Sequence, residues 1–129
     1  MAGVVIQAVP KMCLPTTAAN DQHVLARSVD VSQFREITAV IRLHNGASNP
    51  IFTVDMFAEA LTEEDTLNDF FASTAVATVS LNLAAVTLPS VTELAATIPF
   101  GSAVRLRTTV TTERPNSYVT LSIDVVAKS

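Results

Sequence analysis

The amino-acid sequence predicts an all-β protein, an antiparallel sandwich of two sheets with about eight strands and one short helix. Apolar and polar residues alternate along most of the chain, as they do in strands that turn one side to the core and the other to solvent. Turn-forming residues separate these stretches at intervals of roughly ten residues, a spacing typical of sandwiches and barrels. We expect a jelly roll first and an immunoglobulin-like topology second.

The chain of 129 residues is expected to form one domain, because it shows no internal repeat and no low-complexity stretch. A domain of this size buries roughly two-thirds of its unfolded surface and needs no disulfide or metal to hold it. Residues 1–22 are expected to be an extended strand followed by a loop. The strand, residues 3–9, is stopped by Pro10, and a proline there suits a sheet edge.

The clearest alternation lies in the last quarter, where residues 103–127 are predicted to form one long β-hairpin. Pro115 and Asn116 supply turn chemistry between its two strands. A loop at residues 113–116 sets Arg105 opposite Asp124 on the outer face. The side chains expected on the core-facing side are Val104, Leu106, Thr108, Val110, Val119, Leu121, Ile123 and Val125.

The middle of the chain contains weaker strand signals. Along residues 36–44, apolar side chains at every second position begin with Ile37 and end with Leu43. Asn45 and Gly46 then signal a turn, which we expect to open a longer loop. The strands expected in this region are residues 23–31, 36–44, 51–61, 76–85 and 91–98.

The short helix is expected just after residue 61. Thr62 and Asp65 have the spacing of a capping box, in which a hydroxyl is followed three residues later by an acid. Leu67, Phe70 and Phe71 then follow at helical spacing. We therefore predict one or two helical turns here.

The composition indicates a protein whose surface is covered by other protein. Only 16% of the residues are charged, against about 25% in an ordinary soluble domain, and 49% are hydrophobic. Because so few charges cannot cover a monomer, we expect a homo-oligomer. A net charge of -4 with scattered basic residues argues against nucleic-acid binding. No apolar run is long enough to span a bilayer, so no membrane association is expected.

The sequence predicts neither an enzyme nor a bound cofactor. Cys13 is the single cysteine, so we expect a small buried residue there and neither an intrachain disulfide nor a Cys/His zinc cluster. His23 and His44 are the two histidines, and no Gly-x-Ser-x-Gly nucleophile elbow accompanies them. The chain has Gly3, Gly46 and Gly101 as its glycines, so it lacks a glycine-rich phosphate loop.

Calcium is the one metal for which the sequence offers ligands, in an acidic cluster formed by Glu63, Glu64, Asp65 and Asp69. The spacing of these carboxylates differs from that of an EF-hand loop, and the glycine of such a loop is missing. Acidic residues in the first turn of a helix are stabilised by the helix dipole, which accounts for most of the cluster. No metal site is predicted.

The candidate interaction residues are Arg42, Arg105, Arg107 and Tyr118. The arginines are expected to point outward from strands and to form cross-strand or intersubunit ion pairs. A lectin-like protein would use them with Asn82 or Tyr118 to hold a sugar. Sugar sites favour aromatic platforms, whereas this chain has no Trp and one Tyr.

The strand sequences, taken in order, resemble those of two known kinds of protein. The chain contains Val29-Asp-Val-Ser-Gln-Phe-Arg-Glu-Ile-Thr-Ala-Val-Ile-Arg-Leu43, then Phe52-Thr-Val-Asp-Met-Phe-Ala-Glu-Ala60 with an acidic turn. Arg105-Leu-Arg107 and Leu121-Ser-Ile-Asp-Val-Val126 follow. In this order the sequence resembles small jelly-roll proteins of tailed bacteriophages, among them head decoration, or cement, proteins. It also resembles the galactose-binding, discoidin-like sandwich.

The first resemblance implies a structural virion protein that decorates and stabilises a phage head. The implied partners are copies of the chain itself, with a trimer preferred because head decorations commonly sit on three-fold positions, and the lattice of the major capsid protein. The implied location is the capsid surface, after assembly in the host cytoplasm. The second resemblance implies the alternative function, a carbohydrate-binding module.

Overall fold

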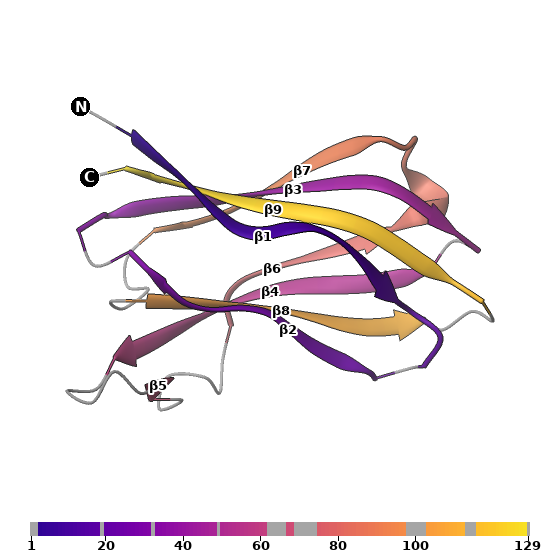
Figure 1. Ribbon diagram of the computed structural model, residues 1–129, viewed down its shortest axis with the longest axis horizontal. Helices are drawn as coiled ribbons and strands as arrows, with labels where there is room; N and C mark the ends of the chain where they lie inside the picture. Colours follow the sequence, from indigo (N-terminus) through magenta and orange to yellow (C-terminus); the bar gives the residue numbers. More distant parts are fainter. Residues whose placement is uncertain are drawn as a thin grey trace.

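Figure 1 shows the computed structural model, in which two antiparallel sheets pack face to face. It describes residues 3–18, 20–31, 33–48, 50–61, 67–68, 75–97, 103–112 and 116–128. Sheet A holds, in spatial order, β1 (Gly3–Pro15), β9 (Tyr118–Lys128), β3 (Glu36–Ala47) and β7 (Ser90–Thr97). Sheet B holds β2 (Gln22–Asp30), β8 (Ala103–Thr112), β4 (Ile51–Leu61) and β6 (Ala75–Asn82), with the short β5 (Leu67–Asn68) also paired to β4.

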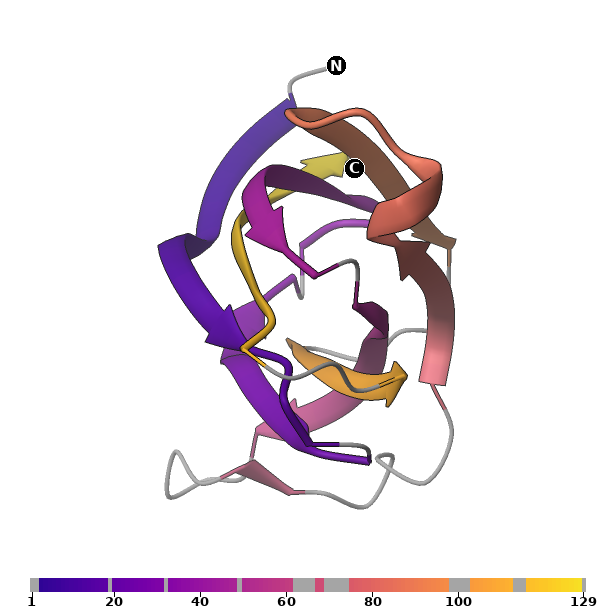
Figure 2. The same cartoon turned by 90° about the vertical axis from the view of Figure 1, so that its right-hand side faces the viewer.

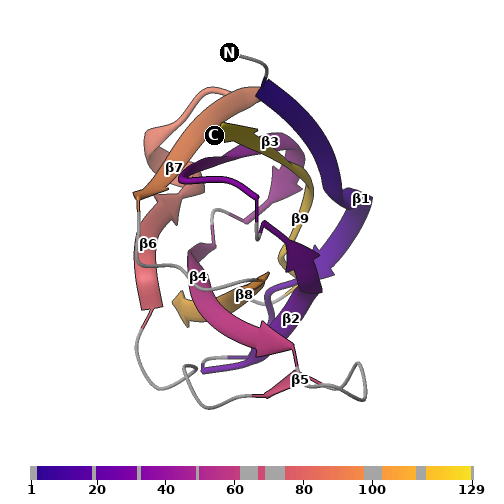
Figure 3. The same cartoon turned by 90° about the vertical axis from the view of Figure 1, so that its left-hand side faces the viewer.

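The chain passes from one sheet to the other at nearly every connection. Apart from β4, β5 and β6, which share sheet B, successive strands lie in opposite sheets, and this is the connectivity of a jelly roll. The predicted all-β, two-sheet antiparallel sandwich is therefore confirmed. In the end-on views, β1 lies next to β2 at one side of the sandwich and β7 next to β6 at the other (Figures 2 and 3). The edge strands of the two sheets thus come together at both sides of the sandwich.

The core lies between the sheets and is built from every second residue of the long strands. The alternation predicted for residues 36–44, 104–110 and 119–125 is confirmed, because each inward side chain there is buried. Phe52, Val54 and Met56 of β4 close the core from sheet B and are fully buried. The largest buried side chains are Phe52, Leu14, Ile37, Ile41, Leu43, Met56, Leu106, Leu121, Ile123 and Val9.

The predicted terminal hairpin is wrong, because β8 and β9 lie in different sheets. Strand β8 pairs with β2 and β4, whereas β9 pairs with β1 and β3. Arg105 therefore does not face Asp124. The pairing partner of Arg105 in β4 is Phe57, and the carboxylate of Asp124 lies 2.6 Å from Arg42. The inward side chains of β8 and β9 meet the same core from opposite sides, so their alternation is the same as in a hairpin.

The first strand is longer than predicted. Strand β1 continues past Pro10 to Pro15, although its register with β9 shifts between Gln7 and Val9 and again between Val9 and Met12. Pro10 lies within this irregular stretch and lacks an N–H, so its presence breaks no regular ladder hydrogen bond. As predicted, β1 is an edge strand.

The turn predicted at Asn45 and Gly46 is also wrong, because β3 continues to Ala47 and pairs there with β9. Gly46 serves close packing instead. A Cβ atom at this position would lie 2.9 Å from the carbonyl oxygen of Tyr118 and would also clash with the side chain of Leu83. The glycine is therefore explained by the close approach of two backbones, which local turn statistics do not reveal.

The predicted helix falls mostly on residues 62–66 and 69–74, which lie outside the described residues, together with the whole acidic cluster. Leu67 and Asn68 are described, and they pair with β4 as strand β5, so they do not belong to a helix. Elsewhere in the described ranges, η2 (Leu83–Ala85) is a 3-10 turn capped by the side chain of Asn82. No helix in the described part of the chain is long and apolar enough to cross a membrane.

Candidate functional site

The structure divides the four predicted interaction residues between two opposite surfaces. Arg42 on β3 and Tyr118 at the start of β9 lie on the outer face of sheet A. Arg105 and Arg107 on β8 lie on the outer face of sheet B. The four residues therefore do not form one site, and each outer face is considered separately.

The outer face of sheet B carries a cluster of two arginines, a phenylalanine and an aspartate. The guanidinium carbons of Arg105 and Arg107 lie 4.7 and 4.5 Å from the centre of the Phe57 ring. Phe57 is only 3% exposed, although its side chain lies on the solvent side of the sheet. The arginine side chains therefore help to shield an outward-pointing ring, and cation–π attraction adds to that packing.

Asp55 ties this cluster to the neighbouring strands. Its carboxylate lies 3.3 Å from a terminal guanidinium nitrogen of Arg107 and accepts a hydrogen bond of 2.9 Å from the hydroxyl of Thr78 on β6. Arg107 also reaches the side-chain oxygen of Gln22 on β2. The cluster thus links the strands of sheet B across its outer surface. A largely buried carboxylate is stabilised there by a cation and a hydroxyl donor.

The rest of the outer face of sheet B is dominated by hydroxyl groups. Thr53 pairs with Thr109 on one side and with Ser80 on the other, so three hydroxyl residues form one row across the sheet. Val24, which is 49% exposed, is the large apolar residue that stands out on this face. This surface is therefore suited to contact with water.

The outer face of sheet A has a different character. Val5 on β1 is 66% exposed and Val91 on β7 is 62% exposed, and between them lie the half-buried Val40 and Val126. Arg42 and Asp124 neutralise each other in the middle of this face, at 2.6 Å, whereas the carboxylate of Glu93 lies exposed beside Val40. We call this surface the apolar face after its four outward valines, Val5, Val40, Val91 and Val126; the outward residues of β9 between them, Ser122 and Asp124, are polar.

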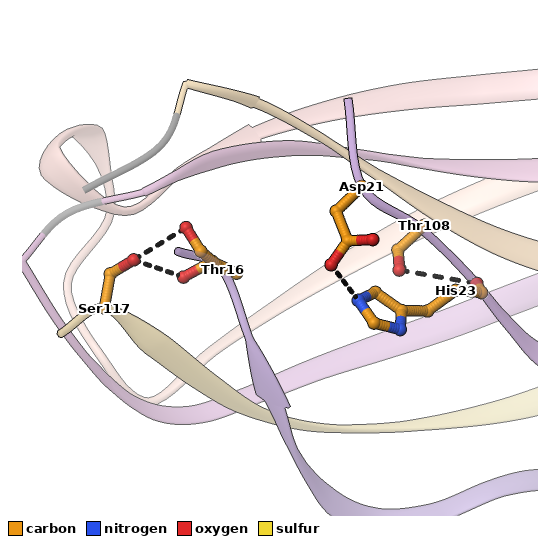
Figure 4. A network of polar contacts seen from close by, with 5 residues as sticks. All are labelled: Thr16, Asp21, His23, Thr108 and Ser117. Carbon is orange, nitrogen blue, oxygen red and sulfur yellow. Dashed lines mark hydrogen bonds and ion pairs between the residues drawn. The ribbon is translucent and has the colours of Figure 1, made fainter. Parts of the chain in front are cut away.

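One end of the sandwich is held by a buried hydroxyl pair. Figure 4 shows that the hydroxyl of Thr16 donates to Ser117 Oγ at 2.7 Å, while the Ser117 hydroxyl donates to the carbonyl oxygen of Thr16 at 2.8 Å. These bonds tie the connection that follows β1 to the residue that precedes β9. Ser117 is 3% exposed, so it is placed to fix the chain and not to meet a substrate.

The two histidines lie apart from this pair. His23 Nε2 is 2.9 Å from a carboxylate oxygen of Asp21, and Figure 4 shows this pair and the Ser117–Thr16 pair as separate groups. His44 contacts the hydroxyl of Ser122 on the outer face of sheet A. Among the described residues no group of three or more His, Cys, Asp and Glu side chains could hold a metal ion.

Comparison with known proteins adds information on the fold. No protein-family model matches the chain, and no curated protein matches it in sequence. The infectious bursal disease virus VP2 subviral particle aligns with 98% of this chain and 32% of its own chain, at a TM-score of 0.56 and 12% identity. The structure of the Gx strain of that virus aligns with the same shares, at a TM-score of 0.51 and 13% identity.

A bacterial enzyme is similar to a comparable extent. The CBM22-1-GH10 modules of Clostridium thermocellum xylanase 10B, complexed with xylohexaose, align with 98% of this chain and 25% of theirs, at a TM-score of 0.50 and 13% identity. The likeness is one of fold. This chain therefore spans between a quarter and a third of the length of these similar chains.

Sequence reasoning missed several residues that define these surfaces. Phe57 interrupts the alternation of β4, and that break was the one signal of its unusual place on the outer face. Val5 and Val91 look like ordinary strand valines in the sequence, because the sequence alone does not show which side of a strand faces solvent. The apolar face could be recognised only after the sheet order was known.

Proposed function

We propose that this chain is a structural, non-enzymatic protein of a virion, which packs through its apolar face against other copies of itself and a protein lattice. The observation that carries the proposal is the exposure of two large apolar side chains, Val5 and Val91, on the outer face of sheet A. Exposed apolar surface of this kind marks interaction sites in soluble proteins.

The size and charge of the apolar face support a protein partner. With strands about 4.8 Å apart and about 3.3 Å per residue, a four-stranded face covers on the order of 600 Å². A standard interface buries roughly 800 Å² on each partner, so this face supplies most of one interface. Arg42 and Asp124 neutralise each other, so Glu93 is the charge in the middle of this face that a matching surface has to accommodate.

The finer form of the proposal is a decoration, or cement, protein on a bacteriophage head, assembled as a trimer on the major capsid lattice in the host cytoplasm. The low share of charged residues, 16%, supports a chain that works while covered by neighbours. The fold likeness to a virus capsid protein is compatible with this role, and it rests on 12% sequence identity.

Substitution of a single exposed valine tests the proposal. Val91→Lys places a charge on the apolar face and is expected to weaken self-association by at least about tenfold, because a buried charge without a partner is costly. Val24→Lys, on the outer face of sheet B, is the matched control and is expected to leave association unchanged. Light scattering over a concentration series measures both. Equal behaviour of the two variants, or a wild-type chain that stays monomeric and binds no lattice, contradicts the proposal.

A carbohydrate-binding module is the second candidate, favoured by the likeness to a structure complexed with xylohexaose. It ranks lower because the ring of Phe57 is covered and Tyr118 is the one exposed aromatic residue among those described. A glycan array and titrations with xylo-oligosaccharides are expected to show no binding. Specific binding that disappears in Arg107→Ala would place this function first.

A further inference from the structure

Residues 3–7 of β1, here called the arm, are held to the sandwich by one neighbouring strand. They pair in unbroken register with β9, from Gly3 opposite Lys128 to Gln7 opposite Asp124. Four of its five residues are exposed, including Val4 at 43% and Val5 at 66%, and only Ile6 is partly buried. The arm is therefore attached mainly by backbone hydrogen bonds and contributes little to the core.

The arm is followed by an irregular stretch that separates it from the anchored part of β1. The register with β9 shifts twice between Gln7 and Met12, and Pro10 lies in that stretch with no N–H to donate. Val9 and Leu14 are fully buried and hold the remainder of the strand in the core. Strand β1 thus has a firmly anchored part, an irregular stretch, and the arm, which has little hold on the core.

We propose that the arm is exchanged between copies of this chain, so that residues 3–7 of one copy pair with β9 of a second copy. An arm that pairs with β9 of a second copy makes the same backbone hydrogen bonds, and places Ile6 in the same way, as an arm that pairs with β9 of its own chain. Exchange therefore loses none of these contacts. Exchange also brings the exposed Val4 and Val5 to the junction of two copies, where they can be covered. The run Val4-Val5-Ile6 is β-branched and favours a strand in either arrangement.

This inference rests on the proposed function, because it requires copies in contact, and it names how they are joined. The partner of the β9 edge is a second copy of the chain. The same edge would also accept a foreign strand, but a disulfide that joins position 5 of one chain to position 126 of another forms only when both strands come from copies of this chain.

A disulfide between the arm and β9 tests the exchange. Val5 and Val126 are directly paired, so a chain carrying Cys13→Ser, Val5→Cys and Val126→Cys can form a disulfide across these strands. After oxidation of the assembled protein, most chains are expected to run as covalent dimers or larger species on a non-reducing denaturing gel. Cys13 and Thr120 are paired beyond the irregular stretch, so Thr120→Cys with the native Cys13 is the matched control and is expected to link within single chains.

Two outcomes distinguish the failure of this inference from the failure of the proposed function. If light scattering shows an oligomer and the disulfides form only within single chains, the exchange is contradicted and the proposed function is not. Light scattering that shows a monomer contradicts the exchange, and a monomer that also binds no lattice contradicts the proposed function as well. A mixture of a Val5→Cys chain and a Val126→Cys chain, each also carrying Cys13→Ser, provides a second measurement, because neither chain can form this link alone. Exchange predicts the mixed disulfide, and its absence in an assembled mixture contradicts exchange.

Discussion

Replacement of Ile123 by Ala is expected to lower the free energy of unfolding by about 2–5 kcal/mol, the usual cost of truncating a fully buried aliphatic side chain. Ile123 lies in the middle of β9, directly between Val9 of β1 and Ile41 of β3, and all three side chains are fully buried. The cavity therefore opens at the centre of sheet A, where the neighbouring strands cannot easily close it. Urea denaturation of the wild type and the variant measures the loss.

Val5→Ala is the matched control for this substitution, since it also shortens a β-branched side chain in sheet A. Val5 is 66% exposed, so the expected change in the isolated chain is within about 0.5 kcal/mol. Similar losses for Ile123→Ala and Val5→Ala would mean that β9 does not lie at the centre of the sheet with Ile123 turned inward.

Replacement of Phe57 by Ala is expected to cost about 3–5 kcal/mol, although the residue lies on the outer face of a sheet. Its ring is 3% exposed, and both Arg105 and Arg107 lie over it. Truncation removes a large buried surface and the aromatic face that faces both guanidinium groups. Thermal and urea melts with matched baselines give the change in stability.

Phe57→Leu provides the comparison for this second substitution. Leucine keeps much of the buried volume but has no aromatic ring, so its loss is expected to be clearly smaller than that of Phe57→Ala. The difference between the wild type and Phe57→Leu reports the ring contacts with the arginines. A loss below about 1 kcal/mol for Phe57→Ala would mean that the ring is solvated and that the arginines do not cover it.

The all-β class, the two sheets and the core-facing positions of the main strands could be predicted from the sequence. Alternation reports which side chains of a strand face a core, and residues 36–44 and 119–125 show it without interruption. The pairing of strands could not be predicted in the same way. In a jelly roll, consecutive strands such as β8 and β9 face each other across the core, and their alternation does not reveal whether they share a sheet.

The partners of the candidate interaction residues could not be predicted from the sequence either. Arg42 and Asp124 form a pair because β3 and β9 are neighbours, although they are far apart in the sequence. Arg107 is joined to Asp55 for the same reason, through β4. The sequence identified these arginines as outward strand residues, and the long-range strand order then decided their partners. Gly46 likewise depends on a close approach of Tyr118 that only the folded chain displays.

The native cysteine offers the most direct measurement of the central claim, that the outer face of sheet A is covered on assembly. The expectation that Cys13 is buried is wrong, because it is exposed on this face, opposite Thr120 of the neighbouring strand β9. Its alkylation by a maleimide is expected to be at least about tenfold slower in the assembled protein than in the dissociated chain, because an interface excludes the reagent. The double variant Val24→Cys, Cys13→Ser has its one cysteine on the outer face of sheet B. This cysteine is expected to react at the same rate in the assembled protein and in the dissociated chain. Equal reactivity of Cys13 in the two states, or slowing at position 24 instead, would contradict the account.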